Sequence, residues 1–272
     1  MKIGFIGTGN MGGAILRGYV NSGKSGGNSL YICNRTRERS DRIVSELSGP
    51  VTVCQDAREL VRACDIVIIG VKPQGMEELL KEIAPEVSEG KVFVSMAAGV
   101  SIAAIKKYLG EKTGIIRIMP NTPAMVGKAM TSLSPCEYVS ESELEAVKVI
   151  FDSIGRAEVV PEHMIDCVIG VSGSSPAYTY MYIDALAKAA EARGMEAEAA
   201  RIFAAQSVLG AAEMVLQSSE SPEQLRINVC SPGGTTIEAV NSLIDNDFEK
   251  IVREAFEAAV NRSIEMTGGT KK

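Results

Sequence analysis

Two glycine-rich stretches of the chain place backbone N–H groups where a helix is expected to begin. The first is Gly7-x-Gly9-x-x-Gly12 in "KIGFIGTGNMGGAI", and the second is "CSPGGTTIEAV", residues 230–240. A helix N-terminus presents unpaired N–H groups and the positive end of the helix dipole, which suits an anion. The two stretches therefore predict two anion-binding sites, one in each half of the sequence.

The first stretch has the spacing of a dinucleotide-binding turn. Gly7 would make the tight turn, Gly9 would let the backbone approach a pyrophosphate, and Gly12 would let the helix pack closely on the strand. An aliphatic strand precedes the motif, and a helix and a second strand follow it. The cofactor-binding residues expected from this turn are Gly7, Thr8, Gly9, Asn10, Met11 and Gly12.

The end of the second expected strand indicates which cofactor is bound. An Asp or Glu at this point commonly binds the free ribose 2′-hydroxyl of NAD(H). Here the sequence is Asn34-Arg35-Thr36-Arg37, which lacks an acid and offers guanidinium groups and a hydroxyl to a 2′-phosphate. This favours NADPH, with NADH as the alternative, and places Asn34 and Arg35 beside the adenosine ribose. In the other interpretation, Arg37 and Arg39 are ordinary solvated charges at a helix start.

Three further stretches follow expected strands: "VKPQ" from Val71, "MAAGVS" from Met96 and "MPNTPAMVG" from Met119. In an open parallel sheet a dinucleotide lies across the carboxyl ends of the strands. The alanines at 97 and 98 would be small enough to let a ring of the cofactor pass. Asn121 or Thr122 would hold the nicotinamide amide or a substrate. The residues assigned to the cofactor here are Val71, Lys72, Pro73, Ala97, Ala98 and Asn121. Structural turns explain each stretch taken alone.

The elements that must position these residues alternate over the first 160 residues. Short aliphatic runs predict strands at 3–6, 30–33, 66–70, 92–96 and 115–119. Helical patterns lie between them, at 12–21, 37–47, 57–63, 76–84, 102–109 and 141–154. Several of the runs lack polar alternation, as expected for strands covered on both faces. The pattern predicts an α/β fold with a Rossmann-type, doubly wound, mainly parallel sheet.

After Pro161 the apolar spacing becomes that of helices. Ser174, Ser175 and Pro176 predict a capped helix start, and Gly194 predicts the end of that helix. Further helices are expected at 197–217, after the capping sequence that begins at 221, and at 248–266. No strand candidate follows residue 161.

These patterns predict two domains. Residues 1–160 form the dinucleotide-binding domain, and residues 161–272 form an all-helical domain for substrate binding and dimerisation. So small a helical domain would gain buried surface from a second copy, which favours a homo-oligomer.

Composition and charge narrow the class of protein. The chain has 272 residues, 46% of them hydrophobic and 23% charged, which is typical of a soluble globular protein. A net charge of −6 without any basic run argues against nucleic acid or an anionic membrane as a partner. The longest aliphatic run, "DIVIIGV", is too short to span a bilayer, and the N-terminus lacks a signal peptide's features. We expect a cytoplasmic protein.

The six cysteines are scattered, without a Cys-x-x-Cys pair. This spacing predicts buried reduced thiols rather than a metal site or disulfides. His163 is the only histidine, and its place in "PEHMIDC" favours a surface or packing role over catalysis.

The second glycine-rich stretch suits a carboxylate. Gly233 and Gly234 expose N–H groups at a helix start, where a carboxylate gains charge-assisted hydrogen bonds. Thr235 or Thr236 would also serve as a simple N-cap, so the stretch alone leaves both interpretations open.

Taken together, these motifs resemble those of the Δ1-pyrroline-5-carboxylate reductases. The resemblance covers nearly the whole chain and rests on "IGTGNMGGAI", "VKPQ", "MPNTPAMVG", "GVSGSSPAYTYMYIDALA", "ARIFAAQSVLGAAEM" and "LRINVCSPGGTTIEAVNSL". It implies hydride transfer from NADPH or NADH to the C=N carbon of a cyclic imino acid, which forms L-proline in the last step of its biosynthesis. It also implies interlocked helical domains, so that each site combines two subunits, and dimers that assemble further, often into decamers.

The resemblance also implies the roles of the substrate-site residues. The backbone of 233–235 would bind the substrate carboxylate with help from Ser231, and Thr236 would place its hydroxyl at the ring nitrogen. A hydroxyl is too weak an acid to be a free proton source, so we expect Thr236, the catalytic residue, to act as an orienting donor. The proton would come from solvent or arrive on the substrate, and no metal is needed. The substrate-binding residues are Asn228, Ser231, Gly233, Gly234, Thr235 and Thr236.

Three positions depart from the family pattern. Ser175 stands where Gly is usual, Ile169 where Thr is common, and Ala129 where Gly usually follows "PAMVGK". These departures leave the reaction class in place and bear on the shape of the pocket.

Two alternative functions use the same fold. A β-hydroxyacid dehydrogenase would need a catalytic lysine on the substrate-domain helix, and the nearest candidate is Lys188, about three turns into that helix. A dinucleotide sensor would bind NADPH without catalysis. The intact "SPGGTT" sequence argues against a sensor, because a sensor has no need of a carboxylate site.

Overall fold

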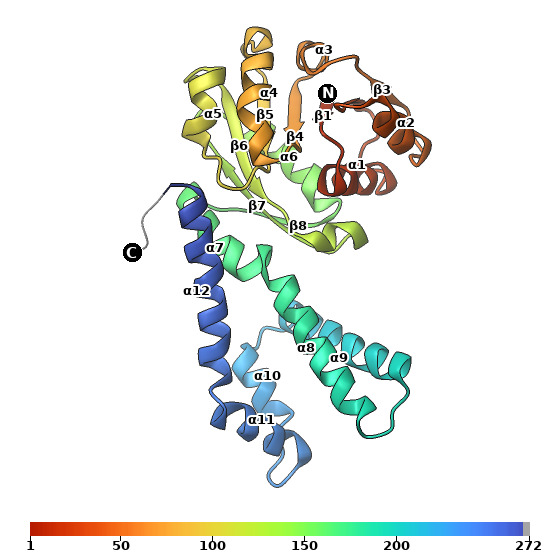
Figure 1. Cartoon of the computed structure of the whole chain (residues 1–272), viewed down its shortest axis with the longest axis vertical. Coiled ribbons are helices and arrows are strands. Elements are labelled where there is room, and N and C mark those ends of the chain that lie inside the picture. The colour runs from red at the N-terminus through yellow and green to blue at the C-terminus, as the bar shows by residue number, and fades with distance from the viewer. Residues whose placement is uncertain (269–272) are drawn as a thin grey trace. The chain divides into compact units, whose positions relative to one another are not determined.

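The computed structural model describes residues 1–268 and divides into two compact units (Figure 1). The first unit contains Met1–Gly173 together with the described chain from Ala259 on, and the second contains Ser174–Ala258. These units divide the chain later than the predicted domains 1–160 and 161–272, and they assign the end of the last helix to the first unit.

The first unit is built on one eight-stranded sheet with the order β3-β2-β1-β4-β5-β6-β7-β8. Its strands are β1 Lys2–Ile6, β2 Ser29–Cys33, β3 Val51–Val53, β4 Ile66–Ile69, β5 Val92–Ser95, β6 Gly114–Met119, β7 Ala129–Pro135 and β8 Gly155–Val159. All neighbours pair in parallel except β6 and β7, which are antiparallel. The predicted Rossmann-type, mainly parallel sheet is confirmed.

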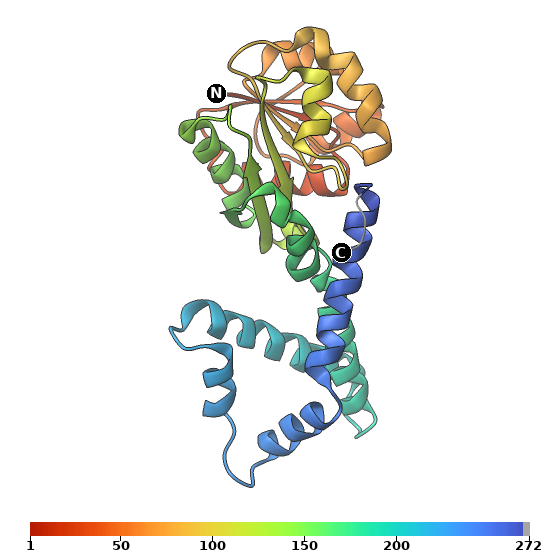
Figure 2. The same ribbon diagram turned by 90° about the vertical axis from the view of Figure 1, so that its left-hand side faces the viewer.

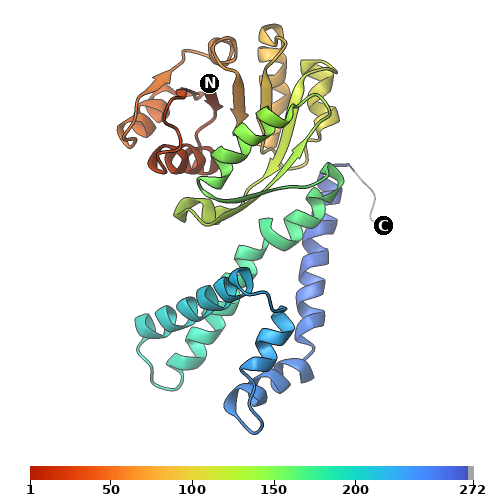
Figure 3. The ribbon, with the colours of Figure 1, turned by 180° about the vertical axis from the view of Figure 1, so that it is seen from behind.

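Helices cover both faces of this sheet (Figures 1 and 3). They are α1 Asn10–Asn21, α2 Arg37–Ser45, α3 Ala57–Ala63, α4 Met76–Ile83, α5 Ile102–Leu109 and α6 Glu141–Asp152, with short turns η1 Pro73–Gly75, η2 Ala84–Glu86 and η3 Thr122–Val126. Side chains of α1, α2 and α6, such as Tyr19 and Phe151, share one buried cluster with the sheet. Side chains of α3, α4 and α5, such as Leu60 and Ile105, share the other. Aliphatic strands without polar alternation are the consequence of this double cover.

After β8 the chain runs through η4 Glu162–Met164, α7 Ile165–Val168 and the π-helix η5 Ile169–Gly173. Polar contacts attach this segment to the first unit. Glu162 pairs with Arg117 of β6 at 3.1 Å, and the Ser263 hydroxyl donates a hydrogen bond to Asp166 at 2.6 Å. These contacts explain why residues 161–173 and the end of the last helix group with the sheet.

The second unit is helical throughout. It contains α8 Ser175–Glu191, α9 Ala197–Gln217, α10 Pro222–Asn228 and α11 Thr235–Asp245, and α12 Phe248–Met266 begins in it. The Ser221 hydroxyl accepts the Gln224 N–H at 3.1 Å, as the capping sequence predicts. The predicted cap at Ser174 is wrong: its side chain makes no cap hydrogen bond, because Ser174 already has helical backbone angles after the π-helix.

The second unit buries few apolar side chains of its own. α8 and α9 pack as a hairpin (Figure 2) around Ala187, Ala200 and Ala204, which are the only buried hydrophobic residues within 174–258. Large apolar side chains such as Met181 and Phe203 are exposed. α9 also meets the length and hydropathy of a membrane span, by length and composition alone. Exposed large apolar side chains in such number are typical of a surface that binds another protein.

Candidate active site

The glycine-rich turn after β1 is shaped by close backbone contacts. Gly7 has a φ of +86°, and its N–H donates to the carbonyl of Cys33 at 2.8 Å. A Cβ on Gly12 would lie 2.4 Å from the Gly7 carbonyl oxygen, so a side chain is excluded there. Gly9 is the N-cap of α1 and has no side-chain cap, and a Cβ on Gly9 would meet nothing within 4 Å. Open space over a helix start fits the pyrophosphate of a dinucleotide.

The strand order reverses between β1 and β4, and the turn lies at this switch point. Gly70, which follows β4, donates its N–H to the Ile6 carbonyl at 2.8 Å, and a Cβ on Gly70 would lie 2.4 Å from the Gly7 oxygen. The chain continues from Gly70 into Val71, Lys72 and Pro73, of which only Lys72 is fully exposed. Gly70 is a site residue that the motifs of the sequence analysis do not include. A glycine at the carboxyl end of an expected strand is nevertheless the kind of residue that indicates close backbone contact there.

Asn34, the first residue after β2, bonds to the turn rather than facing solvent. Its Oδ1 accepts the Thr8 N–H at 2.7 Å, and its Nδ2 donates to the hydroxyls of Thr8 at 2.8 Å and Ser40 at 3.0 Å. Arg35 is exposed, whereas the Arg37 guanidinium pairs with Asp41 at 3.0 Å on α2. Arg35 is therefore an exposed guanidinium next to the end of β2 that makes no ion pair within the described chain.

Ala97 and Ala98 follow β5 at the same edge, and Ala97 is buried while Ala98 is half-buried. Asn121, which follows β6, is buried and engaged: its Nδ2 donates to the Ser172 carbonyl and its Oδ1 accepts the Met130 N–H, each at 3.0 Å. The Asn121 amide therefore connects its own loop to β7 and to the π-helix. With both amide atoms bonded to the backbone, it holds these segments together and does not present free groups to a ligand.

The second predicted site is a turn that leads into α11. The Gly234 N–H donates to the Ser231 carbonyl at 3.0 Å, and Gly233 between them has a φ of +69°. Pro232 followed by a glycine with positive φ is the sequence of a type II turn. Gly234 is the N-cap of α11 and makes no side-chain cap bond, so the interpretation of Thr235 or Thr236 as the N-cap is wrong.

This turn leaves particular groups at the start of α11. The expectation that Gly234 exposes its N–H is wrong, because this N–H is used in the turn. The donors left within the described chain are the N–H of Gly233 and those of the first helical residues, Thr235 and Thr236. A Cβ on Gly234 would lie 2.4 Å from the Ser231 Oγ, so the absence of a side chain is what lets this hydroxyl approach the helix tip. Thr235 and Thr236 are both exposed. The arrangement suits a carboxylate.

Asn228, the last residue of α10, has its side chain engaged within the helical unit. Its Nδ2 donates to Glu220 and its Oδ1 accepts the Gln224 amide, each at 2.8 Å. Lys188 of α8 pairs with Asp184 at 2.7 Å and is exposed. That ion pair raises the pKa of Lys188. An exposed lysine in an ion pair with its own helix offers no support for the catalytic lysine of a β-hydroxyacid dehydrogenase.

The departures from the family pattern occupy ordinary positions. Ala129 begins β7, where it is buried, and its N–H donates to the Ile154 carbonyl at 2.8 Å. Ile169 begins the π-helix, and Ser175 begins α8 with its carbonyl accepting the Thr179 hydroxyl at 3.0 Å.

Metal and thiol chemistry find no support in the described residues. Within 1–268 no group of three or more His, Cys, Asp or Glu side chains could hold a metal ion, and His163 is exposed. The described structure has all six cysteines as free thiols, of which four are buried as expected, whereas Cys167 and Cys230 are only half-buried. Burial raises the pKa of Cys33 and Cys54 to about 11.

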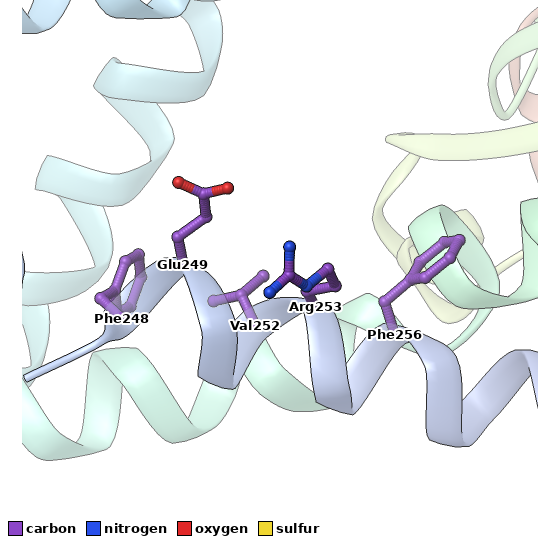
Figure 4. Close-up of a pocket in the computed structure, with 5 residues that line it drawn as sticks. All are labelled: Phe248, Glu249, Val252, Arg253 and Phe256. Carbon is purple, nitrogen blue, oxygen red and sulfur yellow. The ribbon is translucent and has the colours of Figure 1, made fainter.

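A groove lies along the first half of α12 (Figure 4). It has a cavity volume of about 430 Å³, and Phe248, Val252 and Phe256 follow one another along its floor at helical spacing. Glu249 and Arg253 stand beside them. An apolar stripe of this kind, without cover from its own unit, extends the exposed apolar surface of the helical unit.

The doubly wound sheet, the glycine turn at its switch point and the helix tip that suits a carboxylate define an NAD(P)H-dependent oxidoreductase. Residues 2–99 match the family model described as NADP oxidoreductase coenzyme F420-dependent, and residues 162–266 match that described as pyrroline-5-carboxylate reductase dimerisation. The chain belongs to the pyrroline-5-carboxylate reductase family, as its relatives show.

The relatives match over nearly their full lengths. The chain is 42% identical to the pyrroline-5-carboxylate reductase of Escherichia coli over 96% of this chain and 97% of that protein. The structure of a pyrroline-5-carboxylate reductase from Coxiella burnetii has a TM-score of 0.92 at 34% identity, and covers 99% of this chain and 98% of that one. The Plasmodium falciparum enzyme, solved with NADP bound, has a TM-score of 0.84 at 30% identity over 98% of each chain. The match of residues 162–266 to the dimerisation family model indicates that this protein is a homo-oligomer.

Proposed function

We propose that this chain reduces Δ1-pyrroline-5-carboxylate to L-proline, the last step of proline biosynthesis, with NADPH preferred and NADH as a second cofactor. The observation that carries the proposal is the uncapped start of α11 behind the turn 231–234, in a chain whose other unit has a dinucleotide turn. Membership of the reductase family supports the same substrate.

The substrate carboxylate lies at the N-terminus of α11 in this proposal. The N–H groups of Thr235 and Thr236 donate to it, the helix dipole favours its charge, and the Ser231 hydroxyl adds a further donor. The geometry supports a role for Gly234 through its missing side chain, since its own N–H is used in the turn. Asn228 lines the pocket from the end of α10.

The chemistry asks little of the protein beyond orientation. NADPH, when bound, supplies the hydride that reaches the imine carbon. An imine is more electrophilic when its nitrogen is protonated or hydrogen-bonded, so a fixed carboxylate and one donor at the nitrogen are sufficient. Thr236 is that donor in our proposal, and it orients the ring while the proton comes from solvent or arrives with the substrate.

The cofactor lies across the carboxyl ends of the strands of the first unit. The turn Gly7–Gly12 holds the pyrophosphate, the residues 71–73 and 97–98 line the edge, and Arg35 binds the 2′-phosphate. The open space at Gly9 and the exposed guanidinium of Arg35 support this placement. Asn34 and Asn121 support the site from behind through their hydrogen bonds to the backbone.

The proposed oligomer is a dimer in which the helical units interlock, with further assembly such as a decamer, so that each site combines two subunits. The sparse core of the second unit and its exposed apolar side chains support this arrangement. Burial in a dimer interface also explains why α9 is apolar, so no membrane is needed to cover it. We propose a cytoplasmic location.

The experiment that tests the function follows oxidation of NADPH and of NADH, side by side, with a small panel of cyclic imino acids. We expect oxidation that depends on pyrroline-5-carboxylate and is faster with NADPH at low cofactor concentration. Reduction of NADP+ by 3-hydroxy acids, without activity on any imine, would instead identify a hydroxyacid dehydrogenase. Binding of NADPH without turnover on either class would identify a sensor.

A further inference from the structure

The loop Met96–Ser101 connects β5 to α5 and carries Ala97 and Ala98 at the edge where the cofactor is proposed to lie. The middle of the loop makes a single hydrogen bond of its own, from the Val100 N–H to the Ala97 carbonyl at 3.3 Å. The other bonds lie at its ends: the N–H groups of Met96 and Ala97 donate to the Ile69 carbonyl and the Ser95 hydroxyl, each at 3.4 Å, and the Ser101 hydroxyl and carbonyl accept the N–H groups of Ala104 and Ile105, each at 3.1 Å. Its position therefore depends on what holds its two ends. β5 fixes the first end, and the start of α5 fixes the second.

The start of α5 is held by a residue far away in the sequence. The Glu162 Oε1, from η4, accepts the backbone N–H of Ile102 at 2.8 Å. Ile102 is the first residue of α5, and its N–H has no acceptor within the helix. A carboxylate at this position gains both a charge-assisted hydrogen bond and a favourable helix dipole.

Glu162 is in turn held by a buried arginine. The same Oε1 accepts the Arg117 Nη1 at 3.1 Å, and the Arg117 side chain on β6 is 7% exposed against 31% for Glu162. The Arg117 Nη2 is buried without a hydrogen-bond partner in the described chain. An ion pair whose buried arginine keeps an unsatisfied donor is a poor source of stability, so positioning is the better explanation for this pair.

A second contact braces the other side of the loop. Gly99 has a φ of +75°, and a Cβ on it would lie 3.2 Å from the Met266 carbonyl oxygen at the end of α12. The Ser263 hydroxyl, one turn earlier in α12, donates to Asp166 of α7 at 2.6 Å. Met266 of α12 thus lies beside the loop, and Glu162 lies beside the first residue of α5, which directly follows it.

We propose that Glu162, held in place by Arg117, is a positioning residue for the loop Met96–Ser101 and therefore for the cofactor. This inference rests on the proposed function, because the loop is assigned to the cofactor there. Glu162 touches neither cofactor nor substrate. It acts through the N–H of Ile102, which fixes where the loop ends.

The test compares NADPH affinity with substrate KM in the full-length protein. Glu162→Gln keeps an acceptor for the Ile102 N–H but removes its charge. We expect it to raise the Kd for NADPH by about tenfold, the value of the lost charge assistance, while the KM for pyrroline-5-carboxylate at saturating NADPH changes by less than about twofold. Arg117→Lys keeps the charge and should retain an affinity within about threefold of wild type. Glu86→Gln is the matched control, because it removes the Arg62–Glu86 pair at 2.8 Å away from the loop.

Glu162→Gln leaves the buried Arg117 without its counter-charge, so the variant has a reason to misfold. In that case the double variant Arg117→Met/Glu162→Gln removes both charges, and the same loss of NADPH affinity is expected from it. A folded variant with wild-type NADPH affinity overturns the proposal, and so does an equal rise in the cofactor Kd and the substrate KM. A wild-type chain that fails to bind NADPH overturns the proposed function together with this inference.

Discussion

The side chain of Asn34 accepts the backbone N–H of Thr8 at 2.7 Å and so ties the end of β2 to the glycine-rich turn after β1. Its Nδ2 also donates to the Thr8 and Ser40 hydroxyls. Asn34 stands where an acid would bind the ribose of NAD(H), yet its hydrogen bonds serve the turn. We therefore propose that the exposed Arg35 beside it recognises the 2′-phosphate of NADPH.

Arg35→Ala should weaken NADPH binding and leave NADH binding unchanged. We expect the KM for NADPH to rise about tenfold, because a charge-assisted hydrogen bond to phosphate is lost, and the KM for NADH to change by less than about twofold. Arg39→Ala is the matched control, since Arg39 is an exposed residue of α2. Equal losses with both cofactors would contradict the assignment of Arg35 to the 2′-phosphate.

Two glycines of the turn should respond differently to substitution. Gly9→Ser occupies open space at an N-cap, so we expect unchanged thermal stability but NADPH affinity lowered by more than about tenfold, because the side chain takes the place of the pyrophosphate. Gly12→Ala forces a Cβ against the Gly7 carbonyl. We expect this variant to lower both the NADPH affinity and, by about 1–3 kcal/mol, the free energy of unfolding. Gly26→Ala, on an exposed loop, is the control for both measurements. Normal NADPH affinity in a folded Gly9→Ser variant would argue against the site.

Thr236→Ala should lower kcat far more than cofactor affinity. The loss of an orienting donor at the imine nitrogen predicts a fall of about 100-fold in kcat, with the Kd for NADPH within about twofold of wild type. Thr236→Ser keeps the hydroxyl and should recover most of the activity, and Thr235→Ala tests the neighbouring hydroxyl. Wild-type kcat in Thr236→Ala would remove this residue from the mechanism.

Three of the four buried thiols of the first unit, those of Cys33, Cys54 and Cys64, should make the protein sensitive to alkali. Burial raises the pKa of Cys33 and Cys54 to about 11 and that of Cys64 to about 12, from an ordinary value of 9.0. The fold favours the neutral thiols, so their contribution to stability is complete below pH 9 and is lost as the pH rises toward 11 and 12. Urea unfolding at pH 8 and pH 10.5 should show the decrease.

Reactivity toward a thiol reagent gives a second measurement of the same feature. In the native protein at pH 8, Cys33, Cys54 and Cys64 should react far more slowly than the half-buried Cys167 and Cys230. Substitution of Cys33, Cys54 and Cys64 by alanine should flatten the dependence of stability on pH. Rapid native labelling of Cys64 would contradict its burial.

Much of the fold was predictable because aliphatic runs and helical spacing are strong signals. The five predicted strands are present, and α3, α5, α9 and α12 have the predicted bounds. The three strands that the sequence did not indicate lack such runs. β7 is rich in buried hydroxyls such as Thr131 and Ser132, and β8 buries only Ala157. Strand β3 has three residues at the edge of the sheet.

The candidate site was predictable where a motif dictates backbone geometry, as at Gly7, Gly9 and Gly233. Side-chain partners far apart in sequence were not. The bonds of Asn121 to Ser172 and of Glu162 to Ile102 depend on how β6 and the segment after β8 pack together, which local patterns do not encode. The sequence also did not indicate the π-helix before Ser174. Because the chain is already helical there, Ser174 does not cap α8.

The central claim is that the start of α11 binds the substrate carboxylate. It is tested most directly by a crystal structure of the oligomer with L-proline and NADP+. We predict carboxylate oxygens about 3 Å from the backbone nitrogens of Thr235 and Thr236, with the ring nitrogen facing the Thr236 hydroxyl. L-Proline bound elsewhere, with nothing at this helix tip, would contradict the account.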